Sequence, residues 1–226
     1  MRSIWRTPDS GLLRDVAAIA AGAAVNGASF GAIAVAGGLP WWLPVVMSLL
    51  VFAGGSQFMA VGVVAGGGSP AAAVLAGLVL NARHLPFGLA VGDVLGRGLL
   101  ARVVGSHLMV DETVALALAQ RDPARARAAY WSCGVALFGA WNAAVVVGAL
   151  VGGAIGDPGA FGLDAAFPAA LLALTLPALR DRRTRHAALL GSAVALATTP
   201  FLPAGVPVLL ALGGLAATFT RKGVAA

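Results

Sequence analysis

Apolar stretches of about 20 residues follow one another along the whole chain, and short turns or arginine clusters separate them. A transmembrane helix needs about 20 apolar residues to cross a bilayer. Hydrophobic residues make up 59% of the chain and charged residues only 11%, against about 25% charged residues in globular domains. At about 20 residues per span, 226 residues allow at most roughly eight crossings and leave no length for a soluble domain. We therefore predict an all-α, polytopic integral membrane protein with about 7–8 transmembrane segments.

The basic residues indicate an orientation in the membrane. Cytoplasmic loops carry an excess of Lys and Arg, and the strongest positive cluster covers residues 180–185. If residues 70–91 cross the membrane once, placing this cluster in the cytoplasm predicts a cytoplasmic N-terminal segment over residues 1–15 and a cytoplasmic C-terminal tail over residues 221–226. If residues 70–100 are instead re-entrant, the count drops to about seven segments and the N-terminus lies outside, which the three arginines near the N-terminus disfavour. Residues 16–220 are expected to form a single transmembrane domain. The net charge of +6 arises from these short clusters, so it does not indicate a nucleic-acid partner.

Gly54, Gly55, Ser56 and Gln57 lie in the middle of an apolar segment that covers about residues 41–64. Each glycine costs about 1 kcal/mol of helix propensity relative to alanine, so a break or kink is expected here. Transporters use interrupted helices to bind the carboxylate or ammonium group of a substrate. These four residues are therefore candidate substrate-binding residues. The alternative is a helix-packing face on which Gln57 is hydrogen-bonded to a neighbour.

An arginine lies deep in the next apolar segment. Pro70 suits the first turn of a helix, and Arg83 lies 13 residues later, roughly 20 Å along the helix axis. The hydrocarbon core is only about 30 Å thick, so the guanidinium group cannot easily reach either surface. Such charges normally face a bundle interior and mark a functional site. Pro86 removes a backbone donor and disturbs the chain four residues earlier, so we predict an interrupted or re-entrant segment around residues 81–86.

The side chains around this break suit ligand and proton binding. The planar fork of Arg83 suits a carboxylate group, and Asn81 is a further candidate substrate-binding residue. His84 is a candidate proton carrier, because imidazole titrates near neutral pH. The alternative for the arginine is a structural ion pair with Asp111 or Glu112.

Two adjacent carboxylates, Asp111 and Glu112, interrupt an apolar segment that is expected to form one helix over about residues 103–119. Adjacent residues point about 100° apart on a helix, so at most one of the two needs to face a cavity. Either carboxylate is a candidate proton-coupling residue, because desolvation favours its protonated form. The alternative is a helix end near the membrane interface. Further along, Asp164 is most simply a helix N-cap and is otherwise a candidate gate residue.

Several chemistries are excluded or weakly indicated. The stretch from Gly27 to Gly31 matches a serine-hydrolase elbow, but that elbow needs a preceding strand, and this stretch lies in an expected helix. An intramembrane hydrolase using Ser29 and His84 is therefore only a remote alternative. Three histidines and one cysteine form no recognisable zinc pattern, and no phosphate-binding glycine loop occurs. We predict no metal, no cofactor and no enzyme activity.

Four motifs occur in the order and rough spacing of a known family. They are Phe52 to Phe58, Asn81 to His84, Asp111 with Glu112, and Gly162 to Pro168. On these motifs the chain resembles the AzlC family over roughly residues 15–220. The resemblance implies the large subunit of a bacterial inner-membrane exporter of branched-chain amino acids, which works with a small AzlD-type membrane subunit. Methionine is another substrate class of that family, and the family often has Tyr-Gly where this chain reads Pro86-Phe87-Gly88.

The residues and the resemblance together predict a secondary active transporter that exports branched-chain or other hydrophobic amino acids. We expect it to be coupled to the proton gradient and located in the bacterial inner membrane. The expected partners are an amino-acid substrate, membrane lipid and the AzlD-type subunit, with no nucleic acid. The alternative is a non-transporting membrane scaffold or assembly subunit, in which the charged positions form only structural ion pairs.

Overall fold

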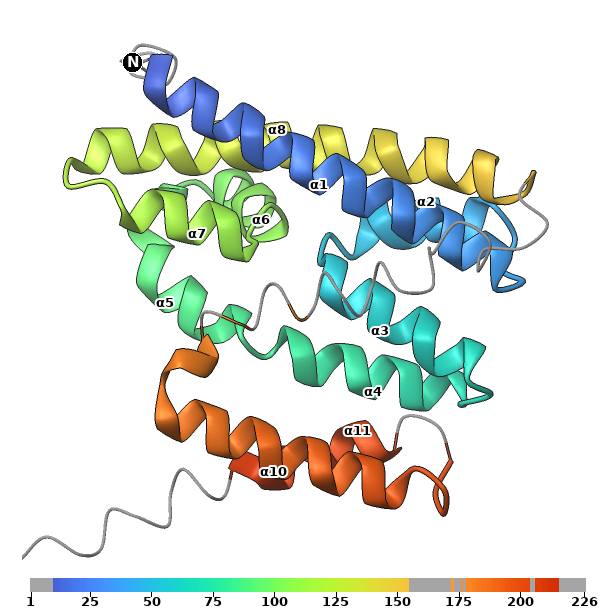
Figure 1. Ribbon diagram of the computed structural model, residues 1–226. Helices are drawn as coiled ribbons and strands as arrows, with labels where there is room; N and C mark the ends of the chain where they lie inside the picture. The colour runs from blue at the N-terminus through green and yellow to red at the C-terminus, as the bar shows by residue number, and fades with distance from the viewer. Residues whose placement is uncertain (1–9, 155–171, 173–175, 177, 204–205, 216–226) are drawn as a thin grey trace, which may run out of the picture. The chain divides into compact units, whose positions relative to one another are not determined.

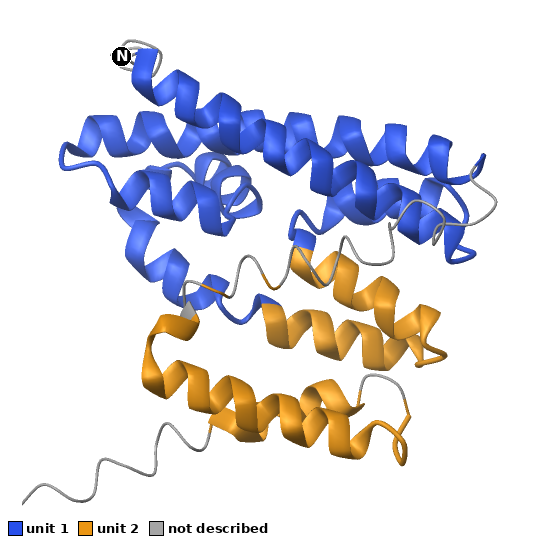
Figure 2. Ribbon diagram, in the orientation of Figure 1, with its two compact units in different colours: residues 1–54, 81–164 blue, residues 55–80, 165–226 orange. Residues whose placement is uncertain are grey.

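The computed structural model describes residues 10–154, 172, 176, 178–203 and 206–215 (Figure 1). These residues form helices, turns and loops, with no β-strand among them, which confirms the all-α prediction for this part of the chain. The chain divides into two compact units (Figure 2). One unit covers Met1–Gly54 and Asn81–Asp164, and the other covers Gly55–Leu80 and Ala165–Ala226. The single transmembrane domain expected over residues 16–220 stays a prediction.

The first unit contains α1 (Ser10–Ala36), α2 (Trp42–Leu50), α5 (His84–Leu95), α6 (Leu99–His107), α7 (Asp111–Leu118) and α8 (Pro123–Gly152). The second contains most of α3 (Gly54–Ala65) and α4 (Pro70–Asn81), with η2 (Ala178–Arg180), α10 (Arg182–Thr198), α11 (Val206–Leu210) and η3 (Ala211–Leu215). Among the described residues, α1 and α8 are long and apolar enough to cross a membrane, and α4 with α5 counts as a third if they form one broken span. The expected 7–8 segments stay a prediction.

Helices α1 and α8 pack together through glycines (Figure 1). A Cβ atom at Gly27 or Gly31 of α1 would overlap the backbone of α8. A Cβ atom at Gly148 or Gly152 of α8 would likewise overlap the backbone of α1. Small residues four apart let transmembrane helices approach closely, which explains both pairs. The residues opposite these glycines rise in number along both helices, so α1 and α8 run in the same direction and their first turns lie at the same end.

Two helix interruptions lie close to where the sequence predicts them. Residues 51–53 separate α2 from α3, and Ala82 with Arg83 separates α4 from α5. The first interruption precedes residues 54–57 instead of falling on them, because Gly54 and Gly55 form the first turn of α3. The second lies just before Pro86, in agreement with the backbone disturbance expected from that proline.

A third interruption shows that the single helix expected over residues 103–119 is wrong. Helix α6 ends at His107, α7 begins at Asp111, and Val110 between them is extended, with φ −137° and ψ 168°. The Thr113 hydroxyl stabilises this helix start. It accepts the Val110 N–H at 3.0 Å and donates to the Val110 carbonyl at 2.8 Å. The first bond satisfies the Val110 N–H, and the Val110 carbonyl additionally accepts the Val114 N–H at 3.1 Å.

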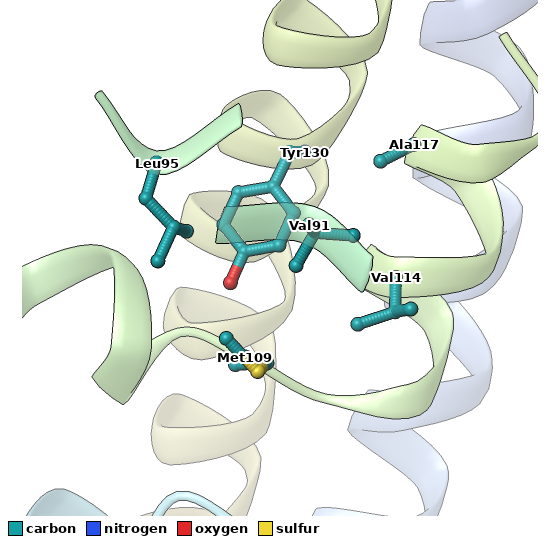
Figure 3. Close-up of a cluster of buried hydrophobic side chains, with 6 residues drawn as sticks. All are labelled: Val91, Leu95, Met109, Val114, Ala117 and Tyr130. Carbon is teal, nitrogen blue, oxygen red and sulfur yellow. The ribbon is translucent and has the colours of Figure 1, made fainter. Parts of the chain in front are cut away.

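A cluster of buried side chains holds the third interruption against α5 and α8 (Figure 3). Its members are Val91, Leu95, Met109, Val114, Ala117 and Tyr130. Tyr130 is fully buried, and its hydroxyl donates to the Gly105 carbonyl at 2.8 Å. Met109 is the central residue of the interruption between α6 and α7, so the cluster fixes the backbone of that interruption.

In the second unit, α3 and α4 pack through small and β-branched side chains, which are Val63, Ala73 and Ala76. Asp181 is the N-cap of α10, and its carboxylate accepts the Thr184 N–H at 2.8 Å. This backbone bond and a second bond from the Thr184 hydroxyl lower the pKa of Asp181. The stabilisation from this cap is therefore complete above the unfolded-state pKa and is lost as the pH falls through the lowered value.

Candidate functional site

The interruption between α4 and α5 and the start of α7 bring an arginine and a carboxylate together. The Nη1 atom of Arg83 lies 2.5 Å from the Oδ2 atom of Asp111, 28 residues further along the chain. Each side chain is 34% exposed. Of the two ion pairs left open by the sequence, the structure forms the one with Asp111. Both residues belong to the first unit.

This ion pair leaves polar atoms unsatisfied. The Nε atom of Arg83 and the Oδ1 atom of Asp111 are buried and have no hydrogen-bond partner among the described residues, and the same holds for Oδ1 of Asn81. A buried polar atom without a partner costs about 1–3 kcal/mol. The three residues therefore hold one donor and two acceptors that no described residue satisfies.

His84 lies next to this pair and contacts two interruptions at once. Its Nδ1 atom lies 2.9 Å from the carbonyl oxygen of Asn81, the last residue of α4. Its Nε2 atom lies 3.0 Å from the carbonyl oxygen of Met109, between α6 and α7. The ring also packs edge-on against Phe87, with ring centroids 6.0 Å apart. The imidazole thus joins residues 81–84 to residues 108–111.

The structure places Asp111 and Glu112 in the first turn of α7. The single helix expected over residues 103–119 is therefore wrong at these two residues, whereas their proton-coupling role and a position near the membrane interface stay predictions. The start of α7 belongs to the interruption between α6 and α7. The partial positive charge at a helix N-terminus stabilises carboxylates there. Glu112 is partly buried.

In the motif at residues 54–57, Gly54 packs against another helix, and Gln57 has a buried amide group without a hydrogen-bond partner among the described residues. A Cβ atom at Gly54 would lie 2.7 Å from the ring of Trp141, so the packing alternative fits this glycine. Ser56 and Gln57 are buried in α3, and Gln57 is 1% exposed. Neither amide atom of Gln57 has a hydrogen-bond partner among the described residues, so its expected bond to a neighbour is wrong for that part of the chain. Gln57 and Arg83 lie in different units, and their grouping in one substrate site stays a prediction.

Two further predictions concern Asp164 and Ser29. Asp164 lies outside the described residues. Ser29 lies within α1, and its hydroxyl donates to the Val25 carbonyl at 3.0 Å. The hydrolase elbow at Gly27 to Gly31 is therefore wrong, because that elbow requires a strand before its turn.

Comparison with known proteins places this chain in a family. The family model described as AzlC protein matches residues 18–155, which include all three interruptions and the Arg83–Asp111 pair. This chain belongs to the AzlC family. A Bacillus subtilis (strain 168) protein named branched-chain amino acid transport protein AzlC is 27% identical over 188 residues, covering 79% of this chain and 72% of that protein. No solved structure matches.

Membership of the AzlC family confirms the resemblance stated from the motifs. It makes this chain an amino-acid transport protein, and its apolar helices agree with a membrane location. The interruptions at residues 82–83 and 108–110 both lie within the part that the family shares.

Sequence reasoning missed a second buried polar contact in this AzlC protein. The hydroxyl of Ser48, on α2, is fully buried and donates to Oδ1 of Asn142, on α8, at 2.7 Å. The Asn142 amide group donates to the Phe138 carbonyl at 2.9 Å. The contact ties α2 to α8 just before the interruption at residues 51–53. The available signal was one polar residue, Ser48 or Asn142, in each of two apolar segments. Because the two residues lie 94 positions apart, their spacing does not indicate that they form a pair.

Replacing Gln57 by methionine is expected to preserve or raise thermal stability and to reduce amino-acid transport. Methionine has a similar volume and removes the unsatisfied amide, whose burial costs about 1–3 kcal/mol. The measurement pairs thermal unfolding of the purified protein with leucine transport by the same variant. Gln120→Met is the matched control, because the Gln120 amide donates to the Leu116 carbonyl of its own helix. A destabilised Gln57→Met variant with unchanged transport would contradict a substrate role.

Proposed function

We propose that this protein exports branched-chain amino acids across the bacterial inner membrane as the large subunit of a secondary active transporter. The observation that carries the proposal is the Arg83–Asp111 pair with its unsatisfied donor and acceptor atoms. Family membership and the name of the Bacillus subtilis relative support amino acids as the substrate. Direction of transport, coupling and the small subunit are the parts of the proposal that need experiment.

The proposed binding geometry matches a zwitterion atom by atom. Nη1 of Arg83 is occupied by Asp111, so the side of the guanidinium group that carries Nε is left for a substrate carboxylate. The Oδ1 atoms of Asp111 and Asn81 are left to accept hydrogen bonds from a substrate ammonium group. The ion pair has no net charge, and neither has a zwitterionic amino acid. Binding therefore adds no net charge to a site where unpaired charge is costly.

The orientation we propose follows from the basic helix ends. Helices α1 and α8 run in the same direction, so the start of α1 with Arg14 and the start of α8 with Arg125 lie at one end of the pair. Lys and Arg are enriched on the cytoplasmic side of membrane proteins. We therefore assign these two starts to the cytoplasm. The arginines at the start of α10 support a cytoplasmic position for that helix end, and with it a cytoplasmic C-terminus.

Efflux from preloaded cells tests the proposal. Cells loaded with labelled leucine would express this protein with or without an AzlD-type subunit, and efflux would be measured before and after the proton gradient is collapsed. We expect efflux that requires both the subunit and the gradient. Efflux unaffected by gradient collapse would contradict the proton coupling. No efflux of leucine, isoleucine, valine or methionine under any condition would contradict the proposed substrate class.

A second candidate function is a non-transporting membrane scaffold. The observation in its favour is that Arg83 already has a carboxylate partner, as a purely structural charge would. A transporter would use the unsatisfied atoms of Arg83, Asp111 and Asn81 to bind its substrate, whereas a scaffold would not need them. Substitutions that keep the pair but remove these atoms therefore distinguish them.

A further inference from the structure

The imidazole of His84 lies between two backbone carbonyl groups. Nδ1 is 2.9 Å from the Asn81 oxygen and Nε2 is 3.0 Å from the Met109 oxygen. Both distances lie within the normal range for a hydrogen bond between nitrogen and oxygen. A carbonyl oxygen accepts hydrogen bonds and cannot donate one. Each ring nitrogen of His84 therefore faces an atom that can only accept.

This arrangement distinguishes the protonation states of the ring. A neutral imidazole carries a proton on one nitrogen and a lone pair on the other, so it can donate to only one of the two carbonyl oxygens. Its second nitrogen would then direct a lone pair at a carbonyl oxygen, which is repulsive. The imidazolium form carries a proton on both nitrogens and can donate to both oxygens. Only the protonated ring satisfies the geometry on both sides.

We propose that His84 is the proton-binding residue of this transporter, and that its protonated form ties the interruption between α4 and α5 to the interruption between α6 and α7. The role in transport rests on the proposed function, whereas the protonated tie rests on the two hydrogen-bond distances alone. Release of the proton removes one of the two bonds. The Arg83–Asp111 pair then remains as the polar contact joining the same two interruptions.

Both partners of the ring are well placed to hold it. Asn81 is the last residue of α4, and the final carbonyl groups of a helix lack partners within the helix. The Asn81 oxygen is therefore available for the ring. Met109 is 5% exposed and lies in the buried cluster with Val91 and Tyr130 (Figure 3), so packing of its side chain fixes this stretch of backbone. Loss of the proton therefore breaks one of the two hydrogen bonds that join the backbone at Asn81 to the backbone at Met109.

The proton site is next to the proposed substrate site. Arg83 and His84 are consecutive residues, and Met109 and Asp111 lie on the same short stretch of chain. A substrate carboxylate on Arg83 and a proton on His84 therefore bind to the same two interruptions. Binding or release at one position changes how firmly the interruptions are held together, and this affects the other position. This provides a physical route for coupling a proton to amino-acid transport.

The other titratable side chains on the elements packed around α5 are accounted for. Arg83 and Asp111 are paired with each other, and Glu112 follows in the first turn of α7. On α5 itself, Asp93 is exposed. On α6, Arg102 donates to the Gly96 carbonyl and His107 packs on Phe52 and Phe138. On α8, Arg127 lies beside Gly96, Tyr130 donates to the Gly105 carbonyl, and Cys133 is buried. Arg97, which follows α5, and Arg125, on α8, are exposed.

Nitrogen NMR of the histidine rings tests the protonated tie without any transport assay. The full-length protein, labelled with ¹⁵N at its three histidines and embedded in lipid nanodiscs, would be recorded over a pH series. His84→Gln, His107→Gln and His186→Gln variants assign the three rings. We expect both ring nitrogens of His84 to carry protons at low pH and one to lose its proton as the pH rises. A ring that stays neutral throughout the series would overturn the proposal.

A transport measurement then tests the coupling separately. The His84→Gln variant is expected to lose efflux driven by the proton gradient and to retain exchange of labelled for unlabelled leucine, which needs no proton. Retained gradient-driven efflux would overturn the coupling role. Loss of both activities would also overturn it, because the residue would then be needed for transport itself. If wild-type protein moves no amino acid at all, the proposed function fails, while the NMR result still decides the protonated tie.

Discussion

The Arg83→Lys variant is expected to fold and to reach the membrane but to lose most of its leucine transport. A lysine keeps the positive charge and can still pair with Asp111, as Nη1 of the arginine does. It cannot also supply the donor that Nε provides, because its ammonium group is a single point of charge. A hydrogen bond to a charged group contributes about 1.5–3 kcal/mol, so apparent leucine affinity should fall roughly 10- to 100-fold.

The measurement is leucine transport as a function of concentration, with surface expression of each variant as the reference. The double variant Arg83→Gln with Asp111→Asn is the matched test of the scaffold alternative. It removes both charges together, so no unpaired charge remains in the membrane. A scaffold should tolerate the double variant, and a zwitterion site should not. Wild-type affinity in Arg83→Lys would show that the arginine fork does not bind the substrate carboxylate.

The interruption beside Arg83 was predictable because local chemistry determines it. Pro86 cannot donate a backbone hydrogen bond and disturbs the chain at Ala82, whichever helices pack nearby. The position of the charge in the apolar segment also follows from counting residues after Pro70. The same local reasoning predicted the break near residues 54–57 and placed it a few residues too late, because two glycines can begin a helix as well as interrupt one.

The interruption at residues 108–110 was not predictable from local signals. No glycine or proline lies between Ser106 and Thr113. The helix stops because the Thr113 hydroxyl satisfies the backbone of Val110 and because Met109 is buried against α5 and α8. These contacts depend on tertiary packing. If this interruption is not known, the sequence places Asp111 inside a helix. The contact between His84 and the Met109 carbonyl could not be inferred either, because its second partner is a backbone atom that no side-chain pattern indicates.

The choice of ion-pair partner also depended on the fold. Asp111 and Glu112 are chemically similar and adjacent, so spacing alone could not select between them. In the structure they occupy successive positions in the first turn of α7, where side chains point about 100° apart. Of these two carboxylates, Asp111 forms the ion pair with Arg83. The sequence therefore identified the right set of charged residues, and the packing of α5 against α7 determined which pair forms.

The Gly148→Ala variant is expected to lose most of its folded protein, although it adds a single methyl group. A Cβ atom at this position would overlap the carbonyl group and Cα atom of Ala28, which are backbone atoms of α1 and cannot rotate away. The whole of α1 would have to move from α8. Overpacking a core typically costs about 1–3 kcal/mol, mostly through side chains that can adjust, so a clash between two backbones should reach or exceed the upper value. Thermal unfolding in detergent measures the loss.

Gly139→Ala in the same helix is the matched control, because nothing lies within 4 Å of a Cβ atom at that position. Replacing glycine by alanine in an open helix position gains about 1 kcal/mol of helix propensity, so this variant should be unchanged or slightly more stable. Gly22→Ala is the corresponding control in α1, where a Cβ atom also meets nothing. Equal stability of Gly148→Ala and Gly139→Ala would contradict a backbone contact between α1 and α8. A stable Gly139→Ala beside an unfolded Gly148→Ala would show that this contact, and not helix propensity, requires the glycine. The same comparison separates variants that lose transport by unfolding from those, such as Arg83→Lys, that should lose it while folded.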